Sequence, residues 1–171
     1  MQTTVLAALA VAGVLLAAVV VTVLVALLAA RAKDAVYEYD QPDFTGRAGF
    51  RAARLPEDDL LRLERVTLSG AGVAQLEYTV QPAWKLILRV GRAGADLDAA
   101  AFGAEFRERV TMYYKDVRVT IGQNEGGAAV LQWSKNGFDH LLALPDTEMG
   151  LRGGLMPLFV EELEMVESKT A

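Results

Sequence analysis

The feature that most constrains this chain is an uncharged apolar run close to its N-terminus, from Val5 to Ala30. Thr22 is the only polar side chain in this run of about 26 residues, and a helix of that length extends about 39 Å. About 20 apolar residues are enough to cross the hydrocarbon core of a bilayer. We therefore predict a single transmembrane helix, with residues 1–32 as the membrane anchor.

A cleaved signal peptide is the competing interpretation of this run. Such a peptide has a basic N-terminal region and an apolar stretch of roughly 7–15 residues. Residues 1–4 contain no basic side chain, and the apolar run is much longer than that, although Ala30-Arg31-Ala32 imitates a cleavage site. The sequence therefore favours an uncleaved anchor.

The side of the membrane on which the rest of the chain lies is not decided by the flanking charges. Arg31 and Lys33 directly follow the apolar run, and the positive-inside rule favours a cytoplasmic domain after them. Asp34 follows immediately, and two basic residues beside an aspartate discriminate poorly between orientations. Both orientations stay open on this evidence.

Composition limits what the remaining part of the chain can do. About 140 residues suit one domain of ordinary size. The formal net charge is −5, and an acidic domain repels phosphate backbones, so we expect no nucleic-acid partner. The chain has no cysteine, which removes disulfides, thiolate metal sites, thiol nucleophiles and a lipid-modified cysteine.

A stretch of short strands follows a tether. Residues 33–48 are acidic, contain Pro42 and show no sustained period, so we predict a tether there and one domain over residues 49–171. Alternation of apolar and polar residues then predicts an antiparallel sheet, with a tight turn at Asn136-Gly137. The predicted strands are Val66–Leu68, Val73–Val80, Trp84–Val90, Val110–Tyr114, Val117–Ile121, Ala128–Trp133 and Phe138–Leu144.

The period changes near the C-terminus. Apolar residues recur there at intervals of three and four, at Leu155, Leu158, Phe159, Leu163 and Val166, and glutamates occupy the positions between them. This pattern predicts an amphipathic helix that covers one face of the sheet. The complete fold prediction is therefore α+β: an N-terminal single transmembrane helix, then a mostly antiparallel β-sheet packed against a C-terminal α-helix.

Residues that could carry catalysis or bind a metal are sparse. His140 is the only histidine, and alternation places it on one face of its strand with Phe138 and Leu142, as a structural or edge residue. A catalytic base is the alternative role for His140. Without a second histidine or a cysteine, a zinc site would depend on carboxylates alone.

Serine nucleophiles and a calcium loop are also poorly supported. Ser69, Ser134 and Ser168 lack the Gly-x-Ser-x-Gly context of a nucleophile elbow. Asp96 and Asp98 are spaced like the start of a calcium loop, which needs glycine at its sixth position and glutamate at its twelfth. Those positions hold Ala101 and Arg107. We therefore predict no catalytic, cofactor-binding or metal-binding residues.

Aromatic residues in the strands have two interpretations. They form the core or cross-strand pairs, which is the usual role of such residues, or they line a ligand groove. The residues in question are Trp84, Trp133, Tyr78, Tyr113, Tyr114 and Phe138.

Several short segments from Gly49 onward occur in a characteristic order. They are Gly49-Phe50 to Leu55-Pro56, Ala74 to Tyr78, Leu86 to Arg89 with Gly94 to Asp96, Val117 to Gly122, Leu131 to Phe138, and the acidic amphipathic segment near the C-terminus. In this order they resemble the bacterial domain of unknown function 4367, found in membrane-anchored proteins and in some anti-sigma regulators. The loop from Leu97 to Phe102 departs from the more polar pattern of that family.

The resemblance implies an extracytoplasmic sensing or binding domain and no catalysis. We therefore predict a single-pass, membrane-anchored, non-enzymatic binding or sensing protein at the cell envelope. Its expected partners are the lipid bilayer and another membrane or envelope protein, with no cofactor. The alternative is a cytoplasmic-facing accessory subunit of a membrane complex, whose helix packs laterally through Ala7, Ala10, Gly13 and Ala17.

Overall fold

The computed structural model describes two compact units of the chain, Met1–Ala35 and Val36–Ala171, here named the helical unit and the sheet domain. The backbone is described for residues 2–55, 57, 59, 61–80, 84–97, 108–114, 117–123, 129–144 and 168–171.

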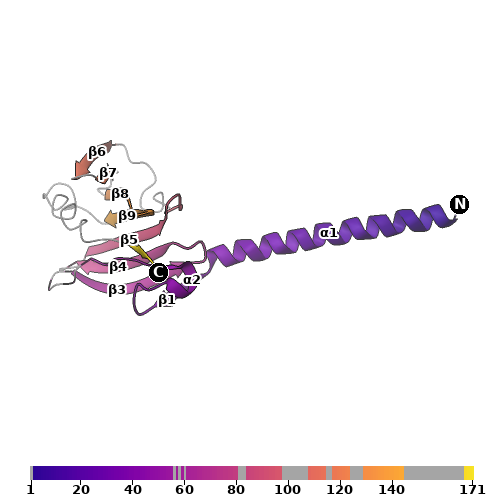
Figure 1. The fold of residues 1–171 in the computed structure, drawn as a ribbon, viewed down its shortest axis with the longest axis horizontal. Helices are drawn as coiled ribbons and strands as arrows, with labels where there is room; N and C mark the ends of the chain where they lie inside the picture. The colour runs from indigo at the N-terminus through magenta and orange to yellow at the C-terminus, as the bar shows by residue number, and fades with distance from the viewer. Residues whose placement is uncertain are drawn as a thin grey trace. The chain divides into compact units, whose positions relative to one another are not determined.

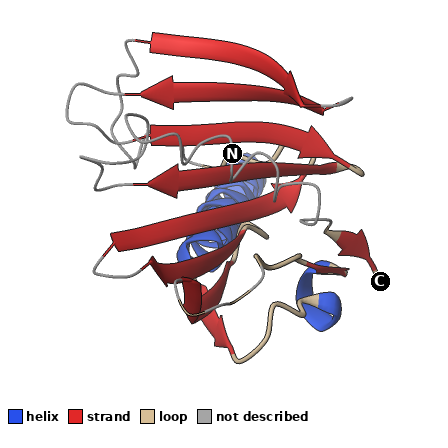
Figure 2. Cartoon of the chain, turned by 90° about the vertical axis from the view of Figure 1, so that its left-hand side faces the viewer, coloured by secondary structure: helices blue, strands red, loops and turns tan. Residues whose placement is uncertain are grey.

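An eight-stranded antiparallel sheet forms the centre of the sheet domain (Figures 1 and 2). Its strand order is β1-β3-β4-β5-β9-β8-β7-β6. The strands are β1 (Val36–Tyr39), β3 (Leu61–Ser69), β4 (Ala74–Val80), β5 (Trp84–Arg92), β6 (Glu108–Tyr114), β7 (Val117–Gln123), β8 (Ala129–Lys135) and β9 (Phe138–Leu144). The strands β3, β4 and β5 pair in chain order, and so do β6, β7, β8 and β9, whereas β1 pairs with β3 across residues 40–60. The strand β5 pairs with β9, so the second half of the sheet folds back beside the first.

The seven predicted strands are confirmed, with differences at their ends. The turn between β8 and β9 is Asn136-Gly137, whose φ angles of 53° and 79° both lie in the left-handed region. A two-residue hairpin turn with positive φ at both positions matches the right-handed twist of the flanking strands. This turn fixes the register of the hairpin, in which Lys135 pairs with Phe138 and Trp133 with His140.

One face of the sheet packs against the segment that precedes β3. This segment contains the short helix α2 (Thr45–Ala48) and the strand β2 (Phe50–Arg51), which pairs with the C-terminal strand β10 (Lys169–Thr170). The rings of Phe44, Phe50 and Phe138 follow one another, with centroid distances of 5.6 Å and 5.2 Å. Phe44 and Phe50 are fully buried, so this segment supplies much of the core.

The buried side chains of this face come from almost every part of the sheet. They include Val66, Leu68, Leu76, Tyr78, Leu86, Leu88, Val90, Leu131, Trp133, Phe138 and Leu142. A smaller cluster lies on the opposite face and consists of Leu97, Val130, Leu141 and Ala143. The sheet therefore buries apolar side chains on both faces, most extensively on the face that carries Phe138.

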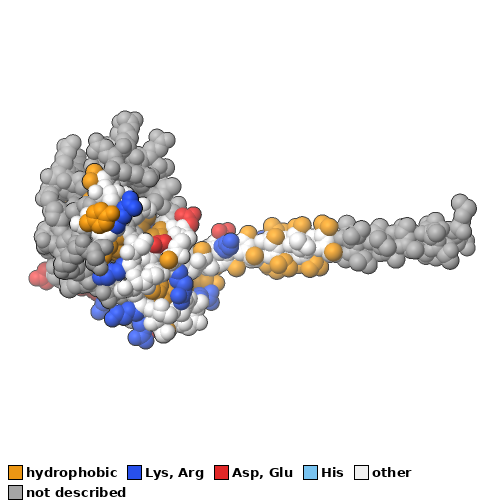
Figure 3. Space-filling view, turned by 45° about the horizontal axis from the view of Figure 1, so that its top comes forward, with side chains coloured by type: hydrophobic (Ala, Val, Ile, Leu, Met, Phe, Trp, Pro, Cys, Tyr) orange, Lys and Arg blue, Asp and Glu red, His pale blue; other side chains and the backbone are white. Residues whose placement is uncertain are grey.

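The helical unit contains one helix, α1 (Gln2–Asp34). The Thr22 hydroxyl donates to the Ala18 carbonyl oxygen at 2.8 Å, so this polar group is satisfied within its own helix. Leu and Val side chains from Val19 to Leu28 are more than half exposed, and Figure 3 shows them around the described part of α1. Among the described residues, no helix combines the length and the apolar character that crossing a membrane requires.

The predicted α+β fold is wrong. The described chain is mostly antiparallel sheet, its helices do not include one fit to cross a membrane, and the described C-terminal residues form β10 instead of a helix. The predicted C-terminal helix around Leu155–Val166 lies outside the described residues. The physical reason for the error is that the segment from Phe44 to Leu55, which has no regular apolar period, covers the sheet face assigned to a helix.

Residues 33–48, the predicted tether, contain regular structure. Within this range, β1 pairs with β3 from Val36 opposite Ser69 to Tyr39 opposite Val66. The Tyr39 ring also meets the Phe44 ring edge-on, with centroids 5.0 Å apart. The sheet domain therefore begins at Val36.

Candidate binding site

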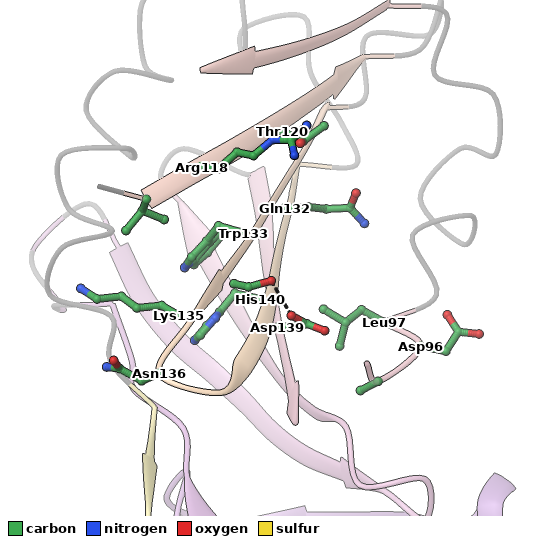
Figure 4. Close-up of a pocket in the computed structure, with 13 residues that line it drawn as sticks. Asp96, Leu97, Arg118, Thr120, Gln132, Trp133, Lys135, Asn136, Asp139 and His140 are labelled. Atoms are coloured by element: carbon green, nitrogen blue, oxygen red, sulfur yellow. Dashed lines mark hydrogen bonds between the residues drawn. The ribbon is translucent and has the colours of Figure 1, made fainter. Parts of the chain in front are cut away.

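A hollow of about 930 Å³ lies around the hairpin of β8 and β9, and we name it the β8 hollow. Residues of β7, β8 and β9 line it together with the loop that follows β5 (Figure 4). Its lining includes Leu97, Arg118, Gln132, Trp133, Lys135 and His140. A volume of this size is in the range of pockets that bind small molecules, roughly 300–1,000 Å³.

Strand alternation decides which side chains meet in the hollow. Trp133 and His140 pair directly across β8 and β9 and therefore share one face of the sheet, and Lys135 is two residues from Trp133 on the same side. Figure 4 shows Trp133, Lys135 and His140 on one side of these strands and Gln132 and Asp139 on the other. The hollow therefore has one side that carries Lys135 and the two rings, and an opposite side that carries Gln132, Asp139 and, by alternation along β7, Arg118.

The side that carries Trp133 and His140 contains two polar atoms without a hydrogen-bond partner. The Trp133 and His140 rings stack with centroids 4.9 Å apart and an interplanar angle of 9°. Among the described residues, the indole Nε1 and the imidazole Nδ1 are buried and have no hydrogen-bond partner. A buried donor left without a partner costs about 1–3 kcal/mol. Both side chains are more than nine-tenths buried.

The remaining ring nitrogen of His140 is paired. Its Nε2 lies 3.3 Å from the Ser168 hydroxyl oxygen, which also accepts a hydrogen bond from the Ala53 backbone N–H at 3.4 Å. Burial lowers the pKa of His140 to about 4, Lys135 acts in the same direction, and the Phe138 carbonyl and Asp139 oppose the shift. His140 is therefore uncharged at neutral pH.

Asp139 holds the opposite side of the hairpin together. Its Oδ2 accepts the Gly94 backbone N–H at 2.6 Å, and its Oδ1 accepts the Ser134 hydroxyl at 2.5 Å. The bond from Gly94 ties the loop after β5 to the hairpin, and the bond from Ser134 links β8 to β9 within it. Asp139 and His140 are consecutive on one strand, so they point to opposite faces of the sheet.

The described serine, histidine and aspartate side chains do not form a catalytic triad. Ser134 bonds to Asp139 on the face opposite His140, whereas Ser168 pairs with His140 without a carboxylate at Nδ1 among the described residues. A nucleophile needs a base that is oriented by a third group. Ser69 is a turn residue whose Oγ accepts the Val73 backbone N–H at 3.2 Å.

The other candidates from the sequence are dispersed. Asp96 lines the β8 hollow, whereas Asp98, Ala101 and Arg107 of the tested calcium spacing lie outside the described residues. Within the described part of the chain, no three His, Asp or Glu side chains converge as metal ligands. Of the aromatic residues, Tyr78 and Phe138 are core residues.

Trp133 has both roles considered from the sequence, because it packs in the core and also lines the hollow. Its contact with His140 was missed by reasoning from the sequence, although a signal was present. A two-residue turn at Asn136-Gly137 places residues 133 and 140 opposite each other by counting outward from the turn.

No protein-family model, curated protein or solved structure matches this chain. The resemblance to the domain of unknown function 4367 stays a prediction.

Proposed function

We propose that this protein is a membrane-anchored, non-enzymatic binding or sensing protein at the cell envelope. The observation that carries the proposal is the β8 hollow, whose wall contains two buried polar atoms that have no partner among the described residues. Such atoms favour a ligand that supplies the missing hydrogen bonds. The ligand is thus expected beside Trp133 and His140.

Attachment to the bilayer is supported by the sequence of the apolar run. Its Leu and Val residues each favour transfer into a bilayer by about 0.3–0.6 kcal/mol on the insertion scale. No charged side chain occurs between Val5 and Ala30, and the apolar side chains from Val19 to Leu28 are exposed in the structure. Exposed apolar surface of this extent is unfavourable in water and favours contact with lipid.

A binding role is favoured over catalysis by the chemistry of His140. A general base works best when its pKa lies near the working pH, whereas burial lowers the pKa of His140 to about 4. The Ser168 hydroxyl beside it is buried, with an exposed fraction of 1%. This pair supplies a fixed hydrogen-bonding wall instead of an activated nucleophile.

Carbonate extraction of membranes tests the anchor. We expect the full-length chain to stay in the membrane pellet at alkaline pH, and Leu24→Lys to move part of it to the supernatant. A lysine in the apolar surface that contacts lipid is unfavourable. Val36→Lys is the matched control, because Val36 is 61% exposed on the edge strand β1 and lies outside the apolar run. Release of the unaltered chain into the supernatant would contradict the proposal.

A cytoplasmic-facing accessory subunit is the second candidate, and Arg31 and Lys33 after the apolar run favour it. Protease treatment of intact cells separates the two. Digestion of the sheet domain in intact cells places it outside the cytoplasm. Protection in intact cells, followed by digestion after lysis, supports the accessory subunit.

A further inference from the structure

We propose that the side of the β8 hollow that carries Arg118, Thr120 and Gln132, here named the polar side, binds a neutral polyhydroxylated ring, the chemistry of a sugar unit. This surface lies across the strands from Trp133 and His140 and is additional to the ligand position proposed above. Its polar groups, the balance of charge around it, an exposed aromatic ring beside it and a fixed wall opposite it support this ligand class.

Three polar side chains meet on the polar side without partners. Arg118 and Thr120 flank the buried Val119 on β7 and therefore point to the same face of the sheet. Thr120 pairs directly with Gln132 of β8, which brings their Cβ atoms within about 5.5 Å of each other. Figure 4 shows the guanidinium end of Arg118 beside Thr120. Within the described part of the chain, Arg118, Thr120 and Gln132 have no hydrogen-bond or ion-pair partner.

The polar groups of this side include both donors and acceptors. The Arg118 guanidinium only donates, whereas the Thr120 hydroxyl and the Gln132 amide donate and accept. The Ser134 hydroxyl donates its proton to Oδ1 of Asp139 at 2.5 Å, so the Ser134 oxygen is left as an acceptor. A ligand hydroxyl donates and accepts, and it therefore satisfies both kinds of group. A carboxylate has no proton for the acceptors, and an ammonium has no acceptor for Arg118.

The charges that line the hollow balance one another. Two of the lining side chains are cationic, Arg118 and Lys135, and two are carboxylates, Asp96 and Asp139. Lys135 and Asp96 each have an interaction of their own, and Asp139 also accepts the Gly94 N–H at 2.6 Å. Because these charges cancel, the field of the hollow attracts neither an anion nor a cation strongly. A neutral ligand is therefore favoured.

An exposed aromatic ring lies beside the polar side. Tyr113 of β6 pairs directly with Arg118, so the two side chains share a face of the sheet. The Tyr113 side chain is 70% exposed and is next to a residue that lines the hollow. A sugar ring presents an apolar C–H face together with polar hydroxyls. An aromatic ring beside a hydrogen-bonding side chain matches this division.

The loop after β5 forms the opposite wall and is fixed by hydrogen bonds. Asp96 and Leu97 of this loop line the hollow, and Figure 4 shows them on the same side of the strands as Gln132. Nη1 of Arg89 donates to the Leu97 carbonyl oxygen at 3.0 Å, and the Gly94 N–H is bonded as described above. A wall that is ordered before binding loses little conformational entropy when a ligand arrives.

The test is a titration of the ¹⁵N-labelled full-length chain with glucose, galactose, mannose and N-acetylglucosamine. The detergent is dodecylphosphocholine, because a maltoside headgroup would itself compete for the site. We expect at least one of these neutral sugars to shift the backbone amide signals of Arg118, Thr120 and Gln132 saturably. The amide signals of β1, at the other edge of the sheet, are expected to stay in place, as is the Trp133 indole signal, which Trp133→Phe identifies.

Charged forms of the same ring test the ligand class. The uronate and the amino sugar that correspond to the best-binding sugar add a carboxylate or an ammonium to it; for glucose they are glucuronate and glucosamine. We expect each to bind at least about threefold more weakly than the neutral sugar. Binding of either charged form as tightly as the neutral sugar would overturn the assignment to a neutral ligand.

Arg118→Met tests the guanidinium contact. The substitution keeps a long side chain and removes the donors, and we expect the affinity for the best-binding sugar to fall about tenfold. Arg62→Met is the matched control, because the Arg62 side chain is 79% exposed on β3 and does not line the hollow. Equal affinities of the two variants would contradict a role of Arg118 in binding.

Tyr113 is tested by a pair of substitutions. Tyr113→Ala removes the ring, and we expect it to weaken sugar binding about threefold. Tyr113→Phe keeps the ring and loses only the hydroxyl, so its affinity is expected to match that of the unaltered chain. Unchanged affinity in Tyr113→Ala would exclude the ring from the binding surface.

A sugar unit can come from a free sugar or from a polysaccharide. The trisaccharide of the best-binding sugar, which is maltotriose for glucose and chitotriose for N-acetylglucosamine, separates these sources. Binding of the trisaccharide about tenfold more tightly than the single sugar assigns the polar side to a polysaccharide. Equal affinities assign it to a free sugar.

Absence of a saturable shift with all four neutral sugars overturns the inference. A shift of the Trp133 indole signal without shifts at Arg118, Thr120 and Gln132 would place the ligand beside the two rings. That result contradicts the assignment to the polar side and leaves the binding role standing. Membrane attachment is judged separately by carbonate extraction. If Arg118→Met does not fold, the comparison of neutral with charged sugars on the unaltered chain decides alone.

Discussion

The Trp133 and His140 rings stack almost parallel across β8 and β9, with their centroids 4.9 Å apart. Each ring covers a face of the other, and the exposed fractions of the two side chains are 4% and 1%. An imidazolium ion in this position would lose nearly all its hydration, which is why burial is the largest cause of the lowered pKa of His140. The stack therefore links the stability of the sheet domain to pH.

We expect the free energy of unfolding to decrease as the pH falls from about 6.5 to 4. His140 has a pKa of about 4 when folded and an ordinary value of 6.5 when unfolded, so in this window the unfolded chain binds one more proton. The stability is fully present above pH 6.5 and declines by about 3 kcal/mol by pH 4. Urea unfolding followed by tryptophan fluorescence measures the effect.

His140→Gln is the control for this prediction, because it removes the titrating group and keeps a polar side chain. The variant is expected to show a weaker pH dependence between pH 4 and 6.5 than the unaltered chain. His140 is the only histidine, so its NMR signals also report its pKa directly. A measured pKa near 6.5, or parallel pH profiles for the two proteins, would contradict the prediction.

Tyr78→Phe is expected to destabilise the sheet domain by about 1–3 kcal/mol. The Leu55 backbone N–H donates to the Tyr78 hydroxyl oxygen at 3.0 Å, and the substitution leaves this N–H buried without its partner. The hydroxyl is deeply buried, and the pKa of Tyr78 is raised to about 12, chiefly by desolvation. Tyr113→Phe is the matched control, because Tyr113 is 70% exposed on β6. Chemical denaturation measures the stability of the two variants. Equal denaturation midpoints for Tyr78→Phe and Tyr113→Phe would show that the hydrogen bond contributes nothing.

The strands could be predicted from the sequence because their determinants are local. In β4 the buried residues Ala74, Leu76 and Tyr78 alternate with partly exposed ones, which is the period of a sheet with one buried face. The Asn136-Gly137 turn is equally local, since few residues other than Asn and Gly adopt positive φ at low cost. These features need no knowledge of the rest of the chain.

The fold class could not be predicted because the cover of the sheet is not periodic. Phe44, Phe50 and Leu55 are fully buried, yet their spacings of six and five residues match neither a helix nor a strand. The pairing of β5 with β9 joins segments about 50 residues apart, and local patterns carry no information about such a contact. The β8 hollow depends on the β5–β9 pairing, which brings the loop after β5 beside the hairpin, so only the Trp133–His140 pairing within it could be inferred.

Phe50→Ala is expected to destabilise the sheet domain by about 3–5 kcal/mol. The Phe50 ring lies between Phe44 and Phe138, so truncation leaves a cavity between the covering segment and the sheet. Val36→Ala is the control, because Val36 is an exposed residue on the edge strand β1 and loses little contact. Thermal unfolding followed by circular dichroism compares the two, and similar midpoints would mean that the covering segment does not stabilise the core.

Alanine substitutions at two glycines are expected to change stability in opposite directions. Gly137 has a φ of 79° and Gly46 lies within α2, and an added Cβ meets no atom within 4 Å at either position. Steric crowding is therefore equal, and only backbone conformation distinguishes the two sites. Gly137→Ala forces an L-residue into the left-handed region and is expected to destabilise by about 1–2 kcal/mol.

Gly46→Ala is expected to stabilise by about 0.4–1 kcal/mol, because alanine restricts the unfolded chain and fits a helical backbone. The difference in urea midpoint between the two variants is the measurement. Destabilisation by Gly46→Ala of the same size as that by Gly137→Ala would contradict the conformational explanation. Loss of the Trp133–His140 pairing on Gly137→Ala, seen as a shift of the Trp133 indole signal, would further show that the turn sets the register of the hairpin that forms the hollow.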